Sequence, residues 1–394
     1  MSAIYRKLRE SAKSNGVATT SRALIEEVNG GAVNPARLSI RKLAEAFMGD
    51  GWAEHLDRYN RTGQVLESVE GVDPSAFAAI TGQLLVNEVR EKYKLASMVA
   101  DSLCSTIAVT NGNLGPQRVP YLSDVTADSD IVEPGMPYSQ TRFSGQYIDH
   151  PAVVKKGKIV AVTAEAIYSD LTSQIIDSAR SVGTRVALGR EEDILKVVLG
   201  ITNPHSWNGT AYSTYLSSGS NWINTVTGFT LTDWTGLNTL EQLFVKMKDP
   251  VTGKPIMIEP KQVFVMPAQK YNLRRIINAT EVESGNYATS GNPSRTTGAN
   301  PLDQNYEILT SPHAFNLLTD SAIGNVSEAN ANARVYLGDF KRAFVWREAK
   351  PLSVIEAPPQ NAAEFNNDIV LSVKASLWGV AGVAEPRAVA LGKE

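Results

Sequence analysis

The sequence has 394 residues, of which 43% are hydrophobic and 20% are charged. This balance allows the chain to bury a core, so an intrinsically disordered protein is excluded. The formal net charge of -3 lacks the basic excess that binding to a phosphate backbone requires, which argues against a direct nucleic-acid ligand. The single cysteine, Cys104, excludes an intrachain disulfide and a multi-cysteine metal site.

The sequence also lacks targeting and membrane signals. Its first ten residues are polar and charged, unlike a secretory signal, and no window approaches the roughly 18 consecutive apolar residues of a membrane span. We therefore expect a protein that is made in the cytosol and has no membrane contact.

Residues 1–100 predict a helical N-terminal region. Apolar residues follow three- and four-residue spacings in two stretches, and the second stretch begins with Asp73 as a candidate cap and Pro74 in the first turn. The residues expected to face inward are Leu38, Leu43, Ala46, Phe47 and Trp52 in the first stretch, and Phe77, Ile80, Leu84, Leu85, Val89 and Tyr93 in the second.

Residues 112–158 predict an extended loop built as a β-hairpin. The first part is rich in glycine, proline and acidic residues, and two alternating stretches follow, TRFSGQYIDH and AVVKKGKIVAVT. We expect these two stretches to pair with each other through a turn between residues 149 and 157. Because an isolated hairpin is marginally stable in water, this one is expected to need a neighbour.

A long helix is predicted over residues 164–199. Thr163 is a plausible N-cap, and an apolar stripe with spacings of three and four residues follows it. The stripe consists of Ile167, Leu171, Ile175, Ala179, Val182 and Val186. A helix of this length spans roughly 50 Å, far above the usual length in globular proteins.

The rest of the chain mixes both kinds of element. We expect a helix over residues 232–248, a buried strand at QVFVMPAQ with a helix after it, short strands between residues 306 and 357, and a closing strand from Asn367 onward. The polar stretch 281–303 predicts a mobile surface loop. No βαβ regularity is visible, so the predicted class is α+β.

Sequence signals for catalysis are missing. His55, His150, His205 and His313 are scattered without metal-ligand spacing, and no GxGxxG, Walker or GxSxG motif is present. Cys104 lies among small and apolar residues, which is typical of a packing thiol. We predict no catalytic residue, no cofactor and no metal, and therefore not an enzyme.

Two charged clusters carry alternative interpretations. Four acidic residues could form a calcium loop, but they lack the glycine and terminal glutamate of an EF-hand, which favours a solvated loop. They are Asp124, Asp128, Asp130 and Glu133. A basic cluster of Lys155, Lys156 and Lys158 is either a solvated turn or one half of an ion-pair contact with an acidic patch on another copy of the chain.

The order of these elements resembles the major capsid proteins of tailed bacteriophages with the HK97 fold. The resemblance covers about residues 96–392 and rests on the acidic, proline-bearing ribbon, the passage KIVAVTAEAI into the long helix, the unit KQVFVMPAQKYNLRRI, and the ending EPRAV before a small apolar tail.

The resemblance implies a domain plan. Residues 1–100 would be a helical N-terminal arm, and the loop 112–158 would lie over a neighbouring subunit. Residues 159–258 and 358–394 would form a peripheral domain with the spine helix 164–199, and residues 259–357 an axial domain.

The implied function is self-assembly. Hexamers and pentamers would close into an icosahedral shell around packaged double-stranded DNA, bound without sequence specificity, in a virion assembled in the host cytoplasm. Further partners would be a portal and scaffolding or decoration proteins. The candidate inter-subunit contacts are Arg118, Asp124, Asp128, Asp130, Glu133, Arg142, Lys155, Lys156 and Lys158.

Two features of the family are treated separately. Some members join subunits by a lysine–asparagine bond assisted by a glutamate, but no glutamate occurs between Asp368 and Glu385, so we predict a non-covalent shell. Some relatives remove an N-terminal segment, whereas we expect residues 1–100 to be retained here.

The alternatives come from several classes of protein. An encapsulin-type cellular shell shares the fold, although its subunits are generally shorter and lack a long N-terminal helical region. Another virion structural protein would form rings or tubes. A hydrolase with residues brought together only by folding has no local sequence support.

Overall fold

The structure is a computed structural model, and it confirms the α+β class. It describes residues 3–15, 17–30, 33, 38–48, 52, 74–93, 98–109, 114–122, 134–135, 145–219, 222–248, 255–286, 294–300, 302, 306–357 and 369–394.

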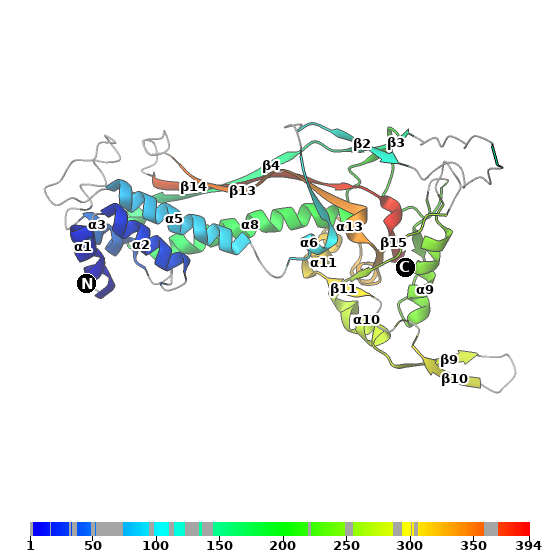
Figure 1. Cartoon of the computed structure of the whole chain (residues 1–394). Helices are drawn as coiled ribbons and strands as arrows, with labels where there is room; N and C mark the ends of the chain where they lie inside the picture. Colours follow the sequence, from blue (N-terminus) through cyan, green and yellow to red (C-terminus); the bar gives the residue numbers. More distant parts are fainter. Residues whose placement is uncertain are drawn as a thin grey trace. The chain divides into compact units, whose positions relative to one another are not determined.

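The helices and strands of the described residues are as follows (Figure 1). The α-helices are α1 (Ala3–Asn15), α2 (Val17–Asn29), α3 (Ile40–Met48), α5 (Pro74–Tyr93), α6 (Ala100–Leu103), α7 (Ala164–Tyr168), α8 (Thr172–Val198), α9 (Trp234–Lys246), α10 (Lys270–Ile277), α11 (Pro312–Thr319), α12 (Glu328–Asn332) and α13 (Phe340–Ala343). The strands are β1 (Ser105–Ala108), β2 (Gln117–Leu122), β3 (Gly145–His150), β4 (Val154–Thr163), β5 (Ser206–Trp207), β6 (Thr210–Ala211), β7 (Thr225–Thr227), β8 (Gln262–Val265), β9 (Glu281–Asn286), β10 (Ser294–Ala299), β11 (Glu307–Thr310), β12 (Val335–Gly338), β13 (Phe344–Glu356), β14 (Ile369–Val383) and β15 (Val389–Lys393).

The chain divides into two compact units. Unit 1 comprises Met1–Ala96, Lys155–Gly189 and Lys350–Trp378, and unit 2 comprises Ser97–Val154, Arg190–Ala349 and Gly379–Glu394. The N-terminal helices, predicted as a separate region, therefore belong to the same unit as the first part of α8. The long elements α8, β13 and β14 each have residues in both units.

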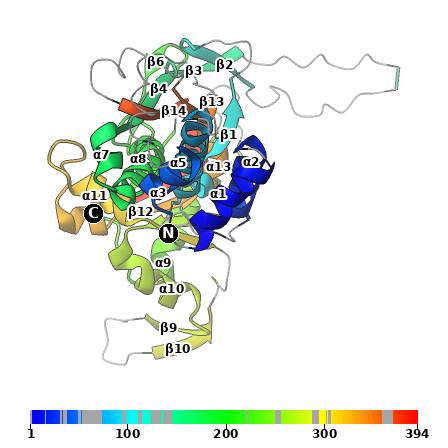
Figure 2. The same cartoon turned by 90° about the vertical axis from the view of Figure 1, so that its left-hand side faces the viewer.

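In unit 1 the N-terminal helices pack against the start of the α7–α8 segment (Figure 2). The backbone N–H of Ile40 donates to Thr172 Oγ1 at 2.8 Å, and Ser39 Oγ donates to Asp170 Oδ1 at 2.7 Å. Trp52 lies against Tyr168, with ring centroids 5.1 Å apart. The five inward residues predicted around α3 are all buried, which confirms that part of the sequence analysis.

The helices α5 and α8 approach each other closely in unit 1. A Cβ atom placed on Gly183 of α8 would lie 2.4 Å from the carbonyl oxygen of Val89 on α5, so only glycine fits there. Beside it, Arg180 Nε donates to Glu88 Oε2 at 2.8 Å, and the Glu88 side chain is only 3% exposed. At this crossing the two helix backbones are in contact and the buried carboxylate of Glu88 finds its counter-charge.

Unit 2 contains a five-stranded sheet with the order β11-β8-β12-β15-β7. All residues of β8 and β12 are buried, as expected for central strands covered on both faces. The helix predicted over residues 232–248 is present as α9, and Asp233 caps it by accepting from the backbone N–H of Thr235 at 3.0 Å. A second sheet, β2-β3-β5-β6, has a small core of Ile148, Trp207 and Trp222.

The predicted pairing within the ribbon was wrong. Both strands exist, but β3 pairs antiparallel with β2 and with β5, whereas β4 belongs to another sheet, with the order β1-β13-β14-β4. A Cβ atom on Gly157 of β4 would lie 2.5 Å from the carbonyl oxygen of Ala375 on β14. The pairing of β4 with β14 therefore depends on close packing between two backbones that are far apart in the sequence. The alternation of apolar and polar residues does not reveal such a contact.

Two other predictions need correction. The long helix is interrupted after α7, where Asp170 has a left-handed φ of 50°, and Leu171 of the predicted stripe is exposed. The stretch predicted as a mobile loop contains the antiparallel pair β9 and β10, which Figure 1 shows side by side. Its polar composition concealed a strand pair because backbone hydrogen bonds, not apolar side chains, define it.

The α5–α8 crossing predicts a position-specific effect of two glycines on one helix. Gly183→Val should lower the free energy of unfolding by about 1–3 kcal/mol, because the new side chain meets the backbone of α5. Gly189→Ala should raise it by about 0.5–1 kcal/mol, because nothing lies within 4 Å of a Cβ there. Chemical denaturation of both variants measures this, and equal effects at the two positions would contradict the proposed contact.

Candidate functional site

An exposed edge strand is the first candidate surface. The sheet order places β4 at an edge, where one row of backbone groups has no strand partner among the described residues. On one face of β4 the side chains of Val160 and Val162 are buried, whereas Ile159 on the opposite face is 64% exposed. A strand with an open edge and an exposed isoleucine is suited to contact with another polypeptide.

The predicted basic cluster lies on this edge strand. Lys155 places its Nζ 5.3 Å from the ring centroid of Trp378, and Lys156 Nζ donates to the carbonyl oxygen of Gly189 at 3.4 Å. Lys158 is exposed. The three lysines therefore belong to a rigid strand rather than a solvated turn, and their contact with another copy stays a prediction.

Arg118 lies on β2 and contacts its own chain. Its Nε donates to Asp149 Oδ1 at 2.9 Å, and its guanidinium lies 3.8 Å from the ring centroid of Tyr147. The hydrogen bond from Arg118 lowers the pKa of Asp149, whose other oxygen accepts from Ser206 Oγ. Both groups stay charged at neutral pH, so this corner of the second sheet is a polar and partly exposed surface.

Five of the predicted contact residues lie outside the described residues. They are Asp124, Asp128, Asp130, Glu133 and Arg142.

The motif EPRAV forms a buried polar centre in unit 2. Arg387 donates from Nε to Glu385 Oε1 at 2.7 Å and from Nη2 to Oε2 at 3.0 Å, and both side chains are at most 5% exposed. Its guanidinium also lies 5.2 Å from the ring centroid of Trp207. Burial lowers the pKa of Arg387 to about 10, which still leaves it charged at neutral pH.

Asn224 connects this centre to the five-stranded sheet. Its side-chain amide donates to the carbonyl oxygens of Pro386 and Val389, each at 3.0 Å, and to that of Thr214 at 2.9 Å. Its Oδ1 accepts from the backbone N–H of Leu216 at 2.8 Å. The turn before β15 is thus held by one ion pair and one amide, which explains why EPRAV precedes the final strand.

Two buried histidines and an arginine form another polar cluster in unit 2. His150, His205 and Arg347 are each 3% exposed. Burial, followed by the charge of Arg347, lowers the pKa of His150 to about 4, and burial lowers that of His205 to about 4. Both imidazoles are therefore neutral at neutral pH.

The described residues offer little for catalysis or membrane insertion. No group of three or more histidine, cysteine or acidic side chains among them could hold a metal ion, and none of their helices could span a bilayer. Burial raises the pKa of Cys104 to about 12, which makes its thiol unreactive, as the sequence predicted.

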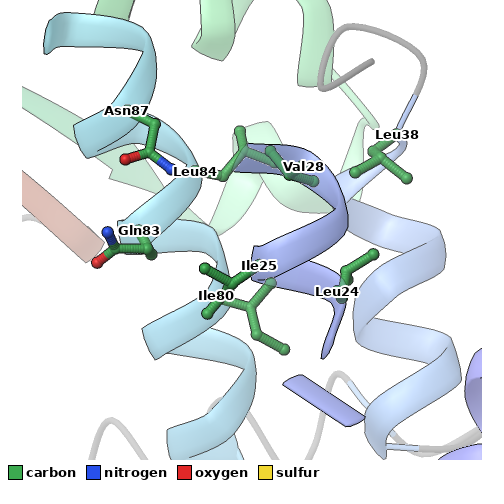
Figure 3. Close-up of a pocket in the computed structure, with 8 residues that line it drawn as sticks. All are labelled: Leu24, Ile25, Val28, Leu38, Ile80, Gln83, Leu84 and Asn87. Carbon is green, nitrogen blue, oxygen red and sulfur yellow. The ribbon is translucent and has the colours of Figure 1, made fainter. Parts of the chain in front are cut away.

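A small pocket lies between α2 and α5 in unit 1. Figure 3 shows apolar side chains from both helices and from the segment before α3, with two amides among them. The lining residues are Leu24, Ile25, Val28, Leu38, Ile80, Gln83, Leu84 and Asn87. It contains no ionisable group, so it supplies no acid, base or nucleophile.

Sequence reasoning missed the residues of the two buried centres. Arg387 was noted only within a motif, and His150 and His205 were noted only as scattered histidines without metal-ligand spacing. The apolar run Phe344, Val345 and Trp346 directly before Arg347 is a signal that this arginine lies on a buried strand. Its partners come from other strands and leave no local pattern.

One comparison with known proteins identifies a family. The profile of the family described as phage capsid protein matches residues 149–391, which is more than half of the chain. No curated protein sequence matches the chain significantly.

Among solved structures, the capsid of cyanophage P-SCSP1u is similar at 14% identity, with a TM-score of 0.46, over 74% of this chain and 86% of that one. The capsid of a native GTA particle is similar at 12% identity, with a TM-score of 0.46, over 76% and 90% of the two chains. A chain of Mycobacterium phage Ogopogo is similar at 15% identity, with a TM-score of 0.41, over 76% and 93%.

The buried ion pair in the EPRAV motif predicts a large loss of folding stability when one of its two charges is removed. Glu385→Gln should lower the free energy of unfolding by about 3–5 kcal/mol, because it leaves the Arg387 guanidinium buried without a counter-charge. Lys261→Ala removes an ion pair to Asp339 whose lysine is 68% exposed, and should cost less than about 1 kcal/mol. Urea denaturation measures the free energy of unfolding of both variants. Similar losses of stability would contradict the idea that burial makes the Glu385–Arg387 pair the more important of the two.

The buried histidines predict acid sensitivity. Their pKa values of about 4 lie below the ordinary value of 6.5, so the unfolded chain binds protons first as the pH falls. Stability should be full above pH 6.5 and should fall between about pH 6.5 and 4, by up to about 3 kcal/mol for each histidine. His205→Gln should flatten this dependence in thermal unfolding at low salt; an unchanged slope would contradict the assignment.

Proposed function

This chain belongs to the phage capsid protein family, and we propose that it assembles through hexamers and pentamers into an icosahedral shell that encloses phage double-stranded DNA. It is a capsid shell protein of the virion, with a structural rather than an enzymatic role. Membership confirms the resemblance on which the HK97-like fold was predicted. Assembly in the host cytoplasm and partnership with a portal and with scaffolding or decoration proteins belong to the same proposal.

The observation that carries the proposal is the exposed edge strand β4. An open strand edge can pair with another chain, and an exposed apolar side chain on the same strand favours such a contact. Here the strand combines the open edge with Ile159 exposed to solvent and with Lys155 and Lys158 beside it. Burial of this surface against a neighbouring subunit would remove the isoleucine from water and pair the strand edge.

Charge complementarity supports the choice of a second copy as the neighbour. The chain carries four acidic residues between positions 124 and 133 and three lysines between 155 and 158. Oppositely charged segments on identical subunits favour a repeated contact in one orientation. Each contact would be weak and sensitive to salt, which suits a shell built from many copies and held together without covalent bonds.

We also propose that residues 1–100 stay in the mature shell. Removal of α5 would expose the backbone of α8 at Gly183 and leave Arg180 without Glu88. It would also leave Leu84, Leu85 and Val89 without their place in the core of unit 1. The N-terminal helices thus stabilise the unit that carries β4 instead of occupying a detachable segment.

Assembly is tested by electron microscopy of the purified full-length chain at high protein concentration. Closed shells or rings of five and six subunits are expected at low salt. The variant Lys155→Glu with Lys158→Glu should reduce the fraction assembled at least tenfold, because two exposed charges on the edge strand change sign.

The matched control is Lys270→Glu, which changes a charge on α10 in unit 2. It should assemble like the unaltered chain. Equal assembly of all three proteins at every salt concentration would remove β4 from the interface, whereas persistent monomers of the unaltered chain would contradict the shell itself. Cellular cargo protein in place of DNA inside natural particles would favour an encapsulin.

Retention of the N-terminal helices is tested by intact-mass spectrometry of purified virions. We expect a mass that includes α1 to α5, because these helices contribute to the core of unit 1. A mature chain that begins near residue 100 would overturn this part of the proposal and leave the assembly proposal standing.

A further inference from the structure

Arg347 is a buried guanidinium without a counter-charge among the residues that the structure describes. It lies on β13 and is 3% exposed; its Nη1 donates to the carbonyl oxygen of Pro151 at 2.8 Å, and its Nη2 has no hydrogen-bond partner. Burial alone lowers its pKa, and no carboxylate of the described residues opposes that effect. This contrasts with Arg387, whose charge is balanced by Glu385.

The two buried histidines lie beside this guanidinium. β3 and β5 pair antiparallel with Ile148 opposite Trp207 and Asp149 opposite Ser206, so one further step places His150 opposite His205. Ser206 Oγ donates to Asp149, which confirms that this pair shares one face and that the histidines share the other with the core residues Ile148 and Trp207. Arg347 binds the carbonyl of the residue directly after His150.

The histidines present unsatisfied nitrogen atoms. Nδ1 of His150 and both ring nitrogens of His205 are buried and have no hydrogen-bond partner. Each neutral imidazole carries one N–H group, and the second amino group of Arg347 adds more. Buried polar groups are usually satisfied by protein, ordered water or a bound ion, so three such side chains in one place indicate an occupant.

We propose that His150, His205 and Arg347 form a binding site for a small monovalent anion of the halide class. One negative charge balances the single guanidinium, and N–H donors are the groups that coordinate an anion. The burial of all three side chains favours an ion of atomic size over phosphate or sulfate. A metal cation is disfavoured, because the fixed charge of Arg347 would repel it and no acidic or thiolate ligand from the described segments joins the two imidazoles.

The site lies within unit 2, so it does not depend on assembly. Its occupant would hold together the end of β3, the start of β5 and the strand β13. Gly382 of β14 closes one side, since a Cβ atom there would lie 2.4 Å from Nδ1 of His150. We therefore expect halide to act as a structural ligand of this unit.

The test is thermal unfolding of the full-length chain in sodium bromide and in sodium gluconate at equal ionic strength. The unaltered protein should show a saturable rise in midpoint with bromide and none with gluconate. Arg347→Leu should abolish this rise, and Arg342→Leu, which removes an exposed arginine of α13, should preserve it. Equal midpoints in both salts would overturn the proposal, and so would an undiminished bromide effect in Arg347→Leu.

A second measurement covers the case in which Arg347→Leu does not fold. Crystals of the unaltered chain soaked in bromide should give an anomalous peak beside Arg347 and the two histidines. Absence of that peak, or stabilisation by zinc ions in place of halide, would assign the cluster to buried water or to a metal and overturn the proposal.

Discussion

Buried charged side chains need a counter-charge, and this requirement determines which segments of the chain pack together at several places. Arg387 meets this requirement with a bidentate contact to Glu385, and this pair holds the turn from which β15 enters the central sheet. Arg180 binds the buried carboxylate of Glu88 where α5 crosses α8. Because a charge taken from water needs a nearby counter-charge, each pair ties together segments that would otherwise separate. No carboxylate in the described part of the chain pairs with Arg347, which is why we propose that an anion binds there.

These internal centres contrast with the surface expected to form the shell. β4 presents an open edge, an exposed isoleucine and exposed lysines, whereas Arg387 and Glu385 balance their charges inside one unit. Unit stability and assembly can therefore respond differently to solution conditions. Salt screens the exposed lysines, but it has little effect on a pair such as Glu385 and Arg387 that water does not reach.

The candidate surfaces could be predicted only in part. The lysine cluster was found because like charges were consecutive in the sequence, and Arg118 was chosen for its place in the ribbon. The partners of both could not be found: Trp378 lies opposite Lys155 and Asp149 opposite Arg118 only after strands have paired. The buried cluster of His150, His205 and Arg347 had no common sequence pattern, because its members come from β3, from the residue before β5 and from β13.

The sequence by itself determined the elements whose causes are local. Asp233 caps α9, the apolar run of β8 forms a buried strand, and the inward positions around α3 follow helical spacing. Only the tertiary structure decided which strands are neighbours, where the long helix breaks at Asp170, and that the N-terminal helices join unit 1. The physical reason is that propensity and capping act within a few residues, whereas strand partners and helix crossings depend on close approaches such as Gly157 to Ala375 and Gly183 to Val89.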